Sequence, residues 1–387
     1  MTEISQQRLI HFIPDEKVTR NFIQMLESVY PNESTYIVYG HTENSDIVSY
    51  GQNVYYYNLK SPALKKVVIN LSKYEAVILH SLEPSPVFQH IEHNNIIWLI
   101  WGGDLYEQMI CNKGYKIYKN NKEQYSIRAK HSPIGNIPVW LYKLLVGVRD
   151  KINLHRSEKI LKKIRFVSSM ECDFNLLKEY FPKYKYKHYH SCSYYPIELQ
   201  IGYDNLNKEC YGLNIWVGNS PALNGNHSSV FNEIKDFSKS IKIYSPISYG
   251  EERLMNYVDN LGGNMIGVNF IPLKTFLPSE KYFNLFLDVN AFIFGHLRQC
   301  ALGNVMMAMY FGGKVFLYRD NPLLQQLRNF GFVVFSIEDD LNELATQTKL
   351  SPNERTINRN IVLSICGIEA IQKQMSIAFS TSSLIGL

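Results

Sequence analysis

The sequence lacks several features that define common classes of protein. No two of its six cysteines form a CxxC pair, so we expect free thiols in a reducing compartment rather than a disulfide framework. The first residues, MTEISQQRLIHF, do not show the basic and apolar regions of a signal peptide. No apolar run approaches the roughly 18 residues that cross a bilayer. These absences predict a cytoplasmic protein whose contact with a membrane would be peripheral.

Motifs for nucleotide and metal chemistry are missing as well. The chain has no GxGxxG fingerprint and no GxxxxGK[ST] loop, which argues against hydride transfer and ATP hydrolysis. It contains no DxD pair of metal-binding carboxylates. His90 and His93, and the group His188, His190 and Cys192, have no second pair at the spacing of a zinc site. We therefore expect neither a metal nor a cofactor.

Positive charge is concentrated in one segment. The net charge is +5, but the segment from Lys113 to Arg165 holds 14 Lys and Arg residues against three acids, Glu123, Asp150 and Glu158. The remainder of the chain is therefore net acidic. This pattern indicates an anionic partner, either a phospholipid surface, a lipid diphosphate or nucleic acid, unless the segment is merely a solvated helical face. No nucleic-acid reader motif accompanies it, so nucleic acid is not expected.

Short apolar runs alternate with helical stretches along all 387 residues. Continuously apolar runs such as AVILH and IIWLIW are typical of parallel strands covered by helices on both faces. Two successive βα series predict two doubly wound α/β domains, residues 1–195 and 196–387, and the last helix could return to pack on the first domain. The expected strands are Leu9–Ile13, Thr35–Tyr39, Val54–Tyr57, Ala76–His80, Ile96–Trp101 and Arg165–Ser168, then Asn214–Val217, Ile241–Tyr244, Met265–Asn269, Ala291–Phe294, Lys314–Leu317 and Phe332–Phe335.

The strongest local feature is WLIWGGDLYE, residues 98–107. A buried strand ends at Trp101, two glycines form a turn, and Asp104 begins a helix. This order places Asp104 at the carboxyl edge of the first sheet, facing the cleft in which open α/β sheets bind ligands. A carboxylate there can act as a general base, or it can simply cap the helix, and the sequence leaves both interpretations open.

Two loops of the second domain have features of an anion site. In NIWVGNSPALNGNH, the small residues Gly218, Asn219 and Ser220 follow a strand and precede a helix that begins near His227. Small residues let backbone N–H groups approach an anion at a helix N-terminus. In the second loop, Arg298 precedes a helix that begins near Leu302, so it could bind a phosphate with two hydrogen bonds. An ordinary turn and a structural salt bridge are the alternatives.

At these motifs the sequence resembles a known family. WGGDLYE, VGNS with a following Asn-His, the RQxxLG stretch, YRDNPLLQQL and FSIEDDL occur in the order seen in glycosyltransferase family 56. Members of that family are TDP-N-acetylfucosamine:lipid II N-acetylfucosaminyltransferases of enterobacterial common antigen synthesis. The resemblance implies a GT-B fold, in which two Rossmann-like domains face a cleft, and an inverting, metal-independent transfer by an enzyme associated peripherally with the inner face of the bacterial inner membrane.

The resemblance also implies partners and a mechanism. The donor would be a TDP-sugar held by the second domain, and the acceptor a polyprenyl-diphosphate-linked saccharide. From its position after the strand, Asp104 is our own candidate for the base that activates the acceptor. Departures from the family at Gly103, between Phe294 and Arg298, and after Met109 leave the sugar and the acceptor open. A GT-B transferase of O-antigen or capsule assembly and a non-enzymatic lipid-diphosphate binder are the alternatives. The donor-side candidates are Gly218, Asn219, Ser220, Tyr249, Arg298, Gln299, Gly303 and Asn304.

One part of the basic segment carries an apolar stripe. In IGNIPVWLYKLLVGVRDKI, residues 134–152, apolar side chains including Trp140 and Leu144 recur at helical spacing, with Lys143 and Arg149 close by. An apolar stripe beside basic residues suits a helix lying in the lipid interface. We expect these four residues to contact the acceptor or the membrane, unless the stripe packs inside the first domain.

Overall fold

The computed structural model divides the chain into two compact units. It describes residues 7–40, 53–130, 137–190, 193–194, 196–238, 240–380 and 383–384. Unit 1 comprises Met1–Tyr115, Gly147–Pro196 and Cys366–Leu387, and unit 2 comprises Lys116–Val146 and Ile197–Ile365. The chain therefore leaves unit 1 after Tyr115 and returns at Gly147, which a single boundary near residue 195 does not anticipate.

Unit 1 is built on a seven-stranded sheet of order β3-β2-β1-β4-β5-β6-β7, in which every pairing is parallel. The central strands are buried along their whole length, as their apolar runs predict. Its strands are β1 (Leu9–Pro14), β2 (Ser34–Tyr39), β3 (Val54–Tyr57), β4 (Ala76–His80), β5 (Ile96–Leu99), β6 (Phe166–Ser168) and β7 (Lys187–Tyr189).

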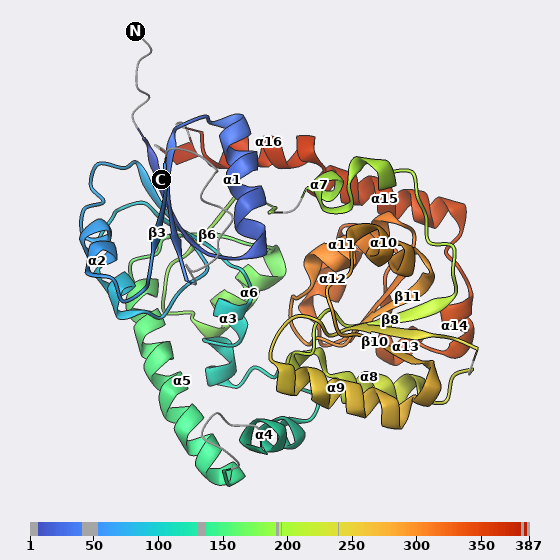
Figure 1. Ribbon diagram of the computed structural model, residues 1–387. Coiled ribbons are helices and arrows are strands. Elements are labelled where there is room, and N and C mark those ends of the chain that lie inside the picture. The colour runs from blue at the N-terminus through green and yellow to red at the C-terminus, as the bar shows by residue number, and fades with distance from the viewer. Residues whose placement is uncertain are drawn as a thin grey trace. The chain divides into compact units, whose positions relative to one another are not determined.

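Helices cover this sheet on both faces. On one face α1 and α16 lie side by side (Figure 1), and Phe22 of α1 and Met375 of α16 are in the same core cluster as alternate residues of β1. On the other face Phe88 contacts Phe12 of β1 edge to face, with 5.5 Å between ring centroids. The helices here are α1 (Lys17–Val29), α2 (Pro62–Val68), η2 (Pro86–His90), α3 (Gly103–Tyr106), η3 (Ile110–Lys113), α6 (Glu171–Tyr180) and α16 (Ile368–Ala378).

Unit 2 is built on a six-stranded parallel sheet of order β10-β9-β8-β11-β12-β13. Its strands are β8 (Asn214–Val217), β9 (Ile243–Pro246), β10 (Phe270–Leu273), β11 (Val289–Phe294), β12 (Lys314–Leu317) and β13 (Phe335–Ser336). Alternate residues of β8 face opposite sides, so Ile215 and Val217 pack with α8 while Trp216 packs against Phe286 of α10, 5.2 Å away.

The helices of unit 2 follow the strands as the βα pattern requires. They are α4 (Asn121–Lys130), α7 (Ile197–Ile201), η4 (Tyr203–Asn205), η5 (Leu223–Gly225), α8 (His227–Ile234), α9 (Glu252–Met265), η6 (Gly267–Asn269), α10 (Ser279–Leu287), α11 (Leu302–Tyr310), α12 (Pro322–Asn329), α13 (Ile337–Asp340), α14 (Glu343–Gln347) and α15 (Pro352–Cys366). One long helix, α5 (Val139–Leu161), begins in the residues of unit 2 and ends in those of unit 1.

Most expected strands are present, and two differences have separate causes. The predicted strand Met265–Asn269 is wrong, because α9 extends to Met265 and a short 3-10 helix follows before β10. The edge strand β7 was not predicted, since two of its three residues are exposed and it has no apolar run. The stretch Pro352–Ala378 is apolar enough by length and composition to cross a membrane. It is interrupted at Gly367, which has extended backbone angles, and Ile371 and Met375 beyond that point are core residues of unit 1.

Candidate active site

The order of strands in unit 2 identifies one place where a ligand would bind. From β8 the chain adds strands in one direction to β10, and β11 then returns to the other side of β8. Such a reversal separates the loops that follow the two neighbouring strands and opens a crevice at their carboxyl ends. The β8 and β11 loops, which carry the predicted donor-side residues, both begin at this point.

The β8 loop is shaped around a buried histidine. Gly218 has a φ of 72°, a left-handed conformation that glycine adopts without strain. A Cβ atom on Gly218 would lie 2.8 Å from Nε2 of His227, and one on Gly225 would lie 2.8 Å from Cε1 of the same ring. Both glycines are therefore required by the close approach of His227, the first residue of α8. The predicted start of this helix is confirmed.

Asn226 joins three segments at this edge of the sheet. It adopts a left-handed conformation, with φ 50° and ψ 38°. Its Nδ2 donates to the carbonyl oxygens of Gly295 (2.7 Å), Asn224 (3.1 Å) and Ile117 (3.2 Å), and its Oδ1 accepts from the amide of Lys119 at 2.9 Å. The sequence analysis included Asn226 only in a family motif and did not predict this structural role, although asparagine is one of the few residues that tolerate this conformation.

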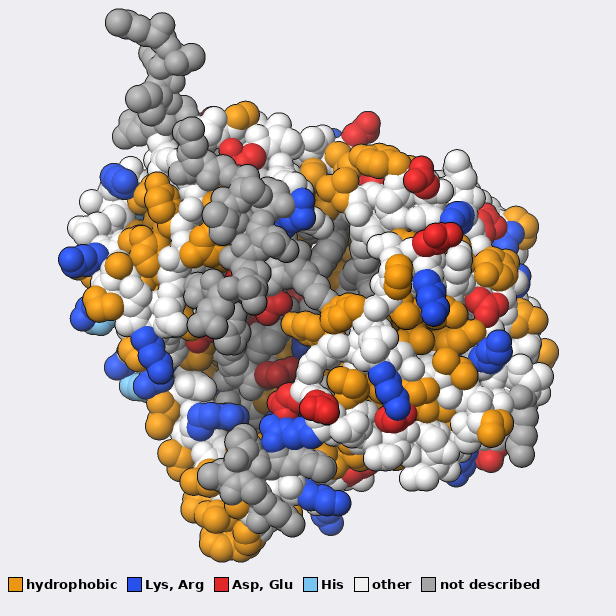
Figure 2. All heavy atoms as spheres, viewed as in Figure 1, with side chains coloured by type: hydrophobic (Ala, Val, Ile, Leu, Met, Phe, Trp, Pro, Cys, Tyr) orange, Lys and Arg blue, Asp and Glu red, His pale blue; other side chains and the backbone are white. Residues whose placement is uncertain are grey.

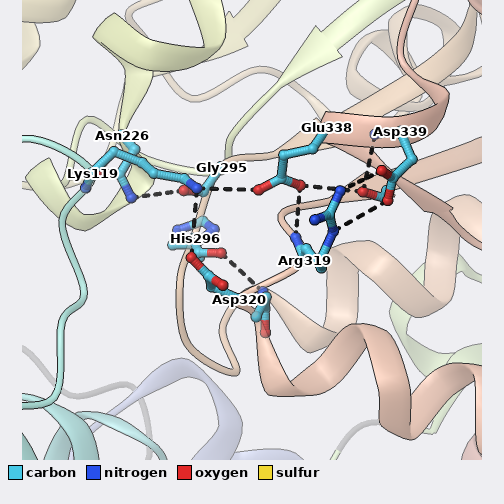
Figure 3. A network of polar contacts seen from close by, with 10 residues as sticks. Lys119, Asn226, Gly295, His296, Arg319, Asp320, Glu338 and Asp339 are labelled. Carbon is cyan, nitrogen blue, oxygen red and sulfur yellow. Dashed lines mark hydrogen bonds and ion pairs between the residues drawn. The ribbon is translucent and has the colours of Figure 1, made fainter.

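Lys119 extends this network toward the ends of β12 and β13 (Figure 3). Its Nζ lies 3.1 Å from Oε1 of Glu338 and 3.7 Å from Oδ2 of Asp320, and 4.2 Å from the centroid of the Tyr318 ring. Burial alone would raise the pKa of Glu338, but hydrogen bonds from the Arg319 amide, its own amide and Lys119 outweigh this and lower it. One lysine of the basic segment therefore lies at the carboxyl edge of this sheet, which its position in the sequence did not reveal.

Two polar atoms in the β8 loop region are buried without a partner among the described residues. They are Oδ1 of Asn219 and Nε2 of His227. Burial lowers the pKa of His227 to about 3, with a smaller contribution from His296, so its imidazole is neutral at physiological pH. Buried polar atoms are nearly always hydrogen-bonded in native proteins, so a loop with two such atoms is typical of a ligand site.

The β11 loop brings the other predicted donor-side residues to the same edge. Gly295 lies so close to the β8 loop that a Cβ atom there would be 2.4 Å from the carbonyl oxygen of Gly225. Arg298 is partly exposed, and its Nη1 donates to the carbonyl oxygen of Gln299 at 2.9 Å. Ala301 has a φ of 56° immediately before α11, a strained conformation for a residue other than glycine.

The remaining donor-side candidates lie around these loops. Gly303 and Asn304 are in the first turn of α11, and both are partly exposed. Tyr249 is half exposed in the loop after β9, next to Gly250, whose Cβ position is 3.5 Å from Pro221 of the β8 loop. Ser220 is partly exposed and accepts a long hydrogen bond of 3.4 Å from the Ala222 amide.

Asp104 does not have the surroundings expected of a base that faces a cleft. Its side chain is buried, with 1% of its surface exposed. Its Oδ2 accepts hydrogen bonds from the Trp98 indole (2.8 Å) and the Leu82 amide (2.9 Å), and its Oδ1 accepts from the Trp101 amide at 3.2 Å. Burial raises the pKa of Asp104, and these hydrogen bonds oppose that shift. The geometry favours a structural anchor that ties β4 to β5.

The sheet of unit 1 has its own reversal, between β1 and β4. Glu83 follows β4 at this point, three residues after His80. Burial raises the pKa of Glu83, and among the described residues its carboxylate has no hydrogen-bond or ion-pair partner. Ser81, between them, has a φ of 70°, again strained for a residue with a side chain. The burial of Glu83 and the backbone conformation of Ser81 could not be predicted from the sequence, because both depend on the folded structure around the end of β4.

The apolar stripe on α5 is exposed. Trp140 is 68% exposed and Leu144 is 58% exposed. About half of the surface is also exposed for Leu145, Val148 and Ile152. Figure 2 shows these hydrophobic side chains gathered over the lower end of α5 in that view. Lys143 lies over the Tyr125 ring at 4.8 Å, and Arg149 is paired with Asp150. The expectation that the stripe is accessible is confirmed, although residues 131–136 of the basic segment lie outside the described residues.

Comparison with known proteins identifies the family. The model of the 4-alpha-L-fucosyltransferase family, glycosyl transferase group 56, matches residues 154–357, which is more than half of the chain. The chain belongs to glycosyltransferase family 56. It is therefore a glycosyltransferase, and the non-enzymatic alternative is set aside. The matched range of this family 56 enzyme contains Gly218, His227 and Arg298, whereas Glu83, Asp104 and the stripe on α5 lie before it.

Solved structures of glycosyltransferases share the fold of this family 56 enzyme. A glycosyltransferase from Rickettsia africae superimposes with a TM-score of 0.56 at 11% identity, covering 97% of this chain and 99% of that one. HepE from Anabaena, in complex with UDP and glucose, gives 0.60 at 9% identity, covering 98% and 100%. WaaG, a glycosyltransferase of lipopolysaccharide biosynthesis, gives 0.56 at 10% identity, covering 96% and 100%. The predicted GT-B class is confirmed. Among the described residues, no group of three His, Cys, Asp or Glu side chains is placed to hold a metal ion.

Proposed function

We propose that the enzyme transfers a deoxy-amino sugar of the N-acetylfucosamine type from a TDP-sugar to a polyprenyl-diphosphate-linked saccharide. The main support for a donor site in unit 2 is that the β8 and β11 loops meet where the strand order of its sheet reverses. There, left-handed Gly218, the unpartnered atoms of Asn219 and His227, and Arg298 lie at one sheet edge. The family assignment supports the type of sugar. HepE, which has the same fold and is described with UDP-glucose, supports a nucleotide-diphosphate donor.

The chemistry is a single inverting displacement. The acceptor hydroxyl attacks the anomeric carbon, the bond from that carbon to the diphosphate oxygen breaks, and a base takes the hydroxyl proton. The departing diphosphate is stabilised by fixed donors, namely the amides of Asn219 and Ser220, Arg298 and the first turn of α11. The Gly218 amide is not among them, because it donates to the carbonyl oxygen of Ile293 at 2.9 Å. These donors take the part that a metal ion plays in other transferases, so the reaction is proposed to need none.

Glu83 is a better candidate for the base than Asp104. A general base needs a carboxylate whose proton affinity is near the working pH and whose oxygens are not already committed. Burial raises the pKa of both carboxyl groups. The oxygens of Asp104 accept three hydrogen bonds within unit 1, whereas those of Glu83 accept none among the described residues, and Glu83 lies where the strand order reverses. Asp104 then serves to hold the β4 loop that carries Glu83, through the Leu82 amide.

The enzyme is proposed to work peripherally at the inner face of the bacterial inner membrane. A polyprenyl-linked acceptor stays in the bilayer, so its transferase must reach the membrane surface. The exposed stripe on α5 supplies apolar side chains that can enter the interface, and the neighbouring basic residues favour an anionic leaflet. A transferase of O-antigen or capsule assembly with another sugar nucleotide would share all of these features. The identity of the sugar-nucleotide donor therefore distinguishes the two proposed functions.

A thermal-shift screen against TDP, UDP, GDP and CMP tests the donor. A nucleotide at 100 times its dissociation constant stabilises the folded enzyme by about 2.7 kcal/mol. TDP should give the largest shift, and Arg298→Ala should reduce it, whereas Arg253→Ala, at a partly exposed residue of α9, should not. A larger shift with UDP or GDP would favour the alternative transferase. Transfer to a short-chain polyprenyl-diphosphate saccharide with EDTA present tests the reaction and its independence of metal.

A further inference from the structure

On one face of the helix α5, the side chains change from apolar to cationic along the length of the helix. With 100° per residue, positions 140, 144, 148, 151, 152, 155 and 159 fall within about 120° of one another and so share one face. The first part of this face is apolar and exposed, from Trp140 to Ile152. The later part is cationic, with Lys151, His155 and Lys159. Basic residues therefore continue the apolar stripe instead of flanking it.

The cationic part of α5 lines a groove. Together with the short helix η2 it encloses an open space of about 470 Å³ within unit 1. The residues that line it are Pro86, Gln89, Lys151, Ile152, His155, Arg156 and Lys159. Ile152 belongs both to the groove and to the exposed stripe, so the two surfaces are continuous. The groove is larger than one phosphate group and contains no acidic side chain.

The positive charge of the groove is not compensated by nearby acids. Among the described residues, no carboxylate is within 4.0 Å of the side-chain nitrogens of Lys151, Arg156 or Lys159. The acids that lie closest along the chain are engaged elsewhere: Asp150 with Arg149, and Glu158 with Lys113 and Lys183. Glu92, just after η2, is paired with Lys163. Three permanent cations in a concave surface without counter-ions suit a phosphate-bearing ligand.

We propose that this groove binds the phosphate headgroup of an anionic phospholipid while the apolar stripe lies among the acyl chains. The inference rests on the proposed membrane location and adds a specific lipid site to it. Its basis is continuity, because a phospholipid has a phosphate next to apolar chains, and α5 presents cations next to apolar side chains in the same order. Along the helix axis, Lys151 to Lys159 spans about 12 Å and Trp140 to Ile152 about 18 Å, so the cationic and apolar parts are each several side chains long.

Vesicle sedimentation with the full-length enzyme tests the site. The probes are phosphatidylcholine vesicles and vesicles of phosphatidylcholine mixed with phosphatidylglycerol. The triple variant Lys151→Gln, Arg156→Gln, Lys159→Gln should lose about 10²-fold in affinity for the mixed vesicles, at roughly fivefold per cation, and should keep the weak binding to phosphatidylcholine. Trp140→Glu with Leu144→Glu should lose binding to both. The matched control Lys235→Gln, Lys242→Gln, Lys281→Gln removes three exposed cations from unit 2 and should bind as wild type does.

The outcomes separate the groove from the proposed function. Wild-type binding that does not depend on phosphatidylglycerol, or an equal loss in the unit 2 control, would overturn the headgroup site. A raised KM of the groove variant for a water-soluble short-chain polyprenyl-diphosphate acceptor would instead assign the groove to the acceptor diphosphate. If wild type binds mixed vesicles through the groove but transfers no sugar, the proposed function fails while the lipid site stands. Thermal unfolding confirms that each variant is folded.

Discussion

Nε2 of His227 lies 2.8 Å from the position that a Cβ atom would occupy on Gly218. His227, the first residue of α8, and Gly218, the residue that follows β8, thus constrain each other's conformation. Gly218 must turn with a φ of 72° to leave room for the ring, and the ring in turn fills the space beneath the loop. A loop held in this way keeps its backbone N–H groups fixed before a ligand arrives, which is the condition for strong anion stabilisation.

Gly218→Ala should therefore weaken both stability and donor binding. The new methyl group combines a strained φ with a close contact, and we expect a loss of about 1–3 kcal/mol in the free energy of unfolding. Donor affinity should fall at least tenfold, since the loop must shift to accommodate the methyl group. Gly263→Ala is the control, because it lies in α9 and a Cβ atom there meets nothing within 4 Å. Urea unfolding and nucleotide titration measure both effects, and a Gly218→Ala variant equal to wild type in each would refute the role of this loop.

Asp104→Asn should lower the melting temperature more than the activity of the folded enzyme. The amide keeps one acceptor oxygen, but its NH2 group would face an N–H donor and leave it unpaired, at a cost of about 1–3 kcal/mol. Thermal unfolding and the kcat of enzyme assayed below its melting temperature are the measurements. A variant that melts like wild type but loses 10²–10⁴-fold in kcat would restore Asp104 as the base.

Glu83→Gln should reduce kcat by about 10²–10⁴-fold with little change in donor KM. Since only the ionised carboxylate accepts a proton, and burial raises the pKa of Glu83, wild-type activity should fall as the pH drops through that raised value. The variant should lose this acidic limb of the pH–rate profile. Glu92→Gln, an exposed acid in the same connection between β4 and β5, serves as the control. An acidic limb that persists in Glu83→Gln with near-normal kcat would exclude Glu83 as the base.

The stability of the enzyme should fall in mild acid because of buried histidines. Burial lowers the pKa of His11 and of His227 to about 3 and that of His80 well below its usual value. Between pH 6.5 and about 3 the unfolded chain binds protons at these positions that the folded enzyme does not, so the free energy of unfolding decreases as the pH falls. Each histidine contributes up to about 1.4 kcal/mol per pH unit.

His11→Leu provides the check on this pH dependence. Leucine binds no proton, so the slope of unfolding free energy against pH between 6.5 and 5 should shrink by one histidine's share. At neutral pH the variant should be less stable, because Nε2 of His80 loses the hydrogen bond that joins it to Nδ1 of His11 at 3.0 Å. Urea unfolding across this range makes the measurement, and an unchanged slope would mean that His11 is not the neutral, buried group described above.

The sequence by itself determined the fold class and most of the strands, and it located the two loops that we propose bind the donor. A strand buried on both faces must be apolar throughout, so runs such as Ala76–His80 and Lys314–Leu317 were correctly bounded from composition alone. The apolar stripe on α5 was also predicted from its helical spacing, but the sequence left open whether it packs inside the first domain, and the structure shows it exposed. The family could be proposed from motifs in order, and the match over residues 154–357 confirms it.

Only the tertiary structure decided which residues lie together at each sheet edge. Asp104 and Glu83 look alike in sequence, as acids after apolar strands, but one accepts hydrogen bonds from two neighbouring strand ends and the other accepts none in the described structure. The place of Lys119 beside Asn226 and the groove between η2 and α5 depend on contacts between residues far apart in the chain. Local patterns record burial and periodicity, whereas charge compensation and hydrogen-bond satisfaction depend on neighbours that only the folded chain supplies.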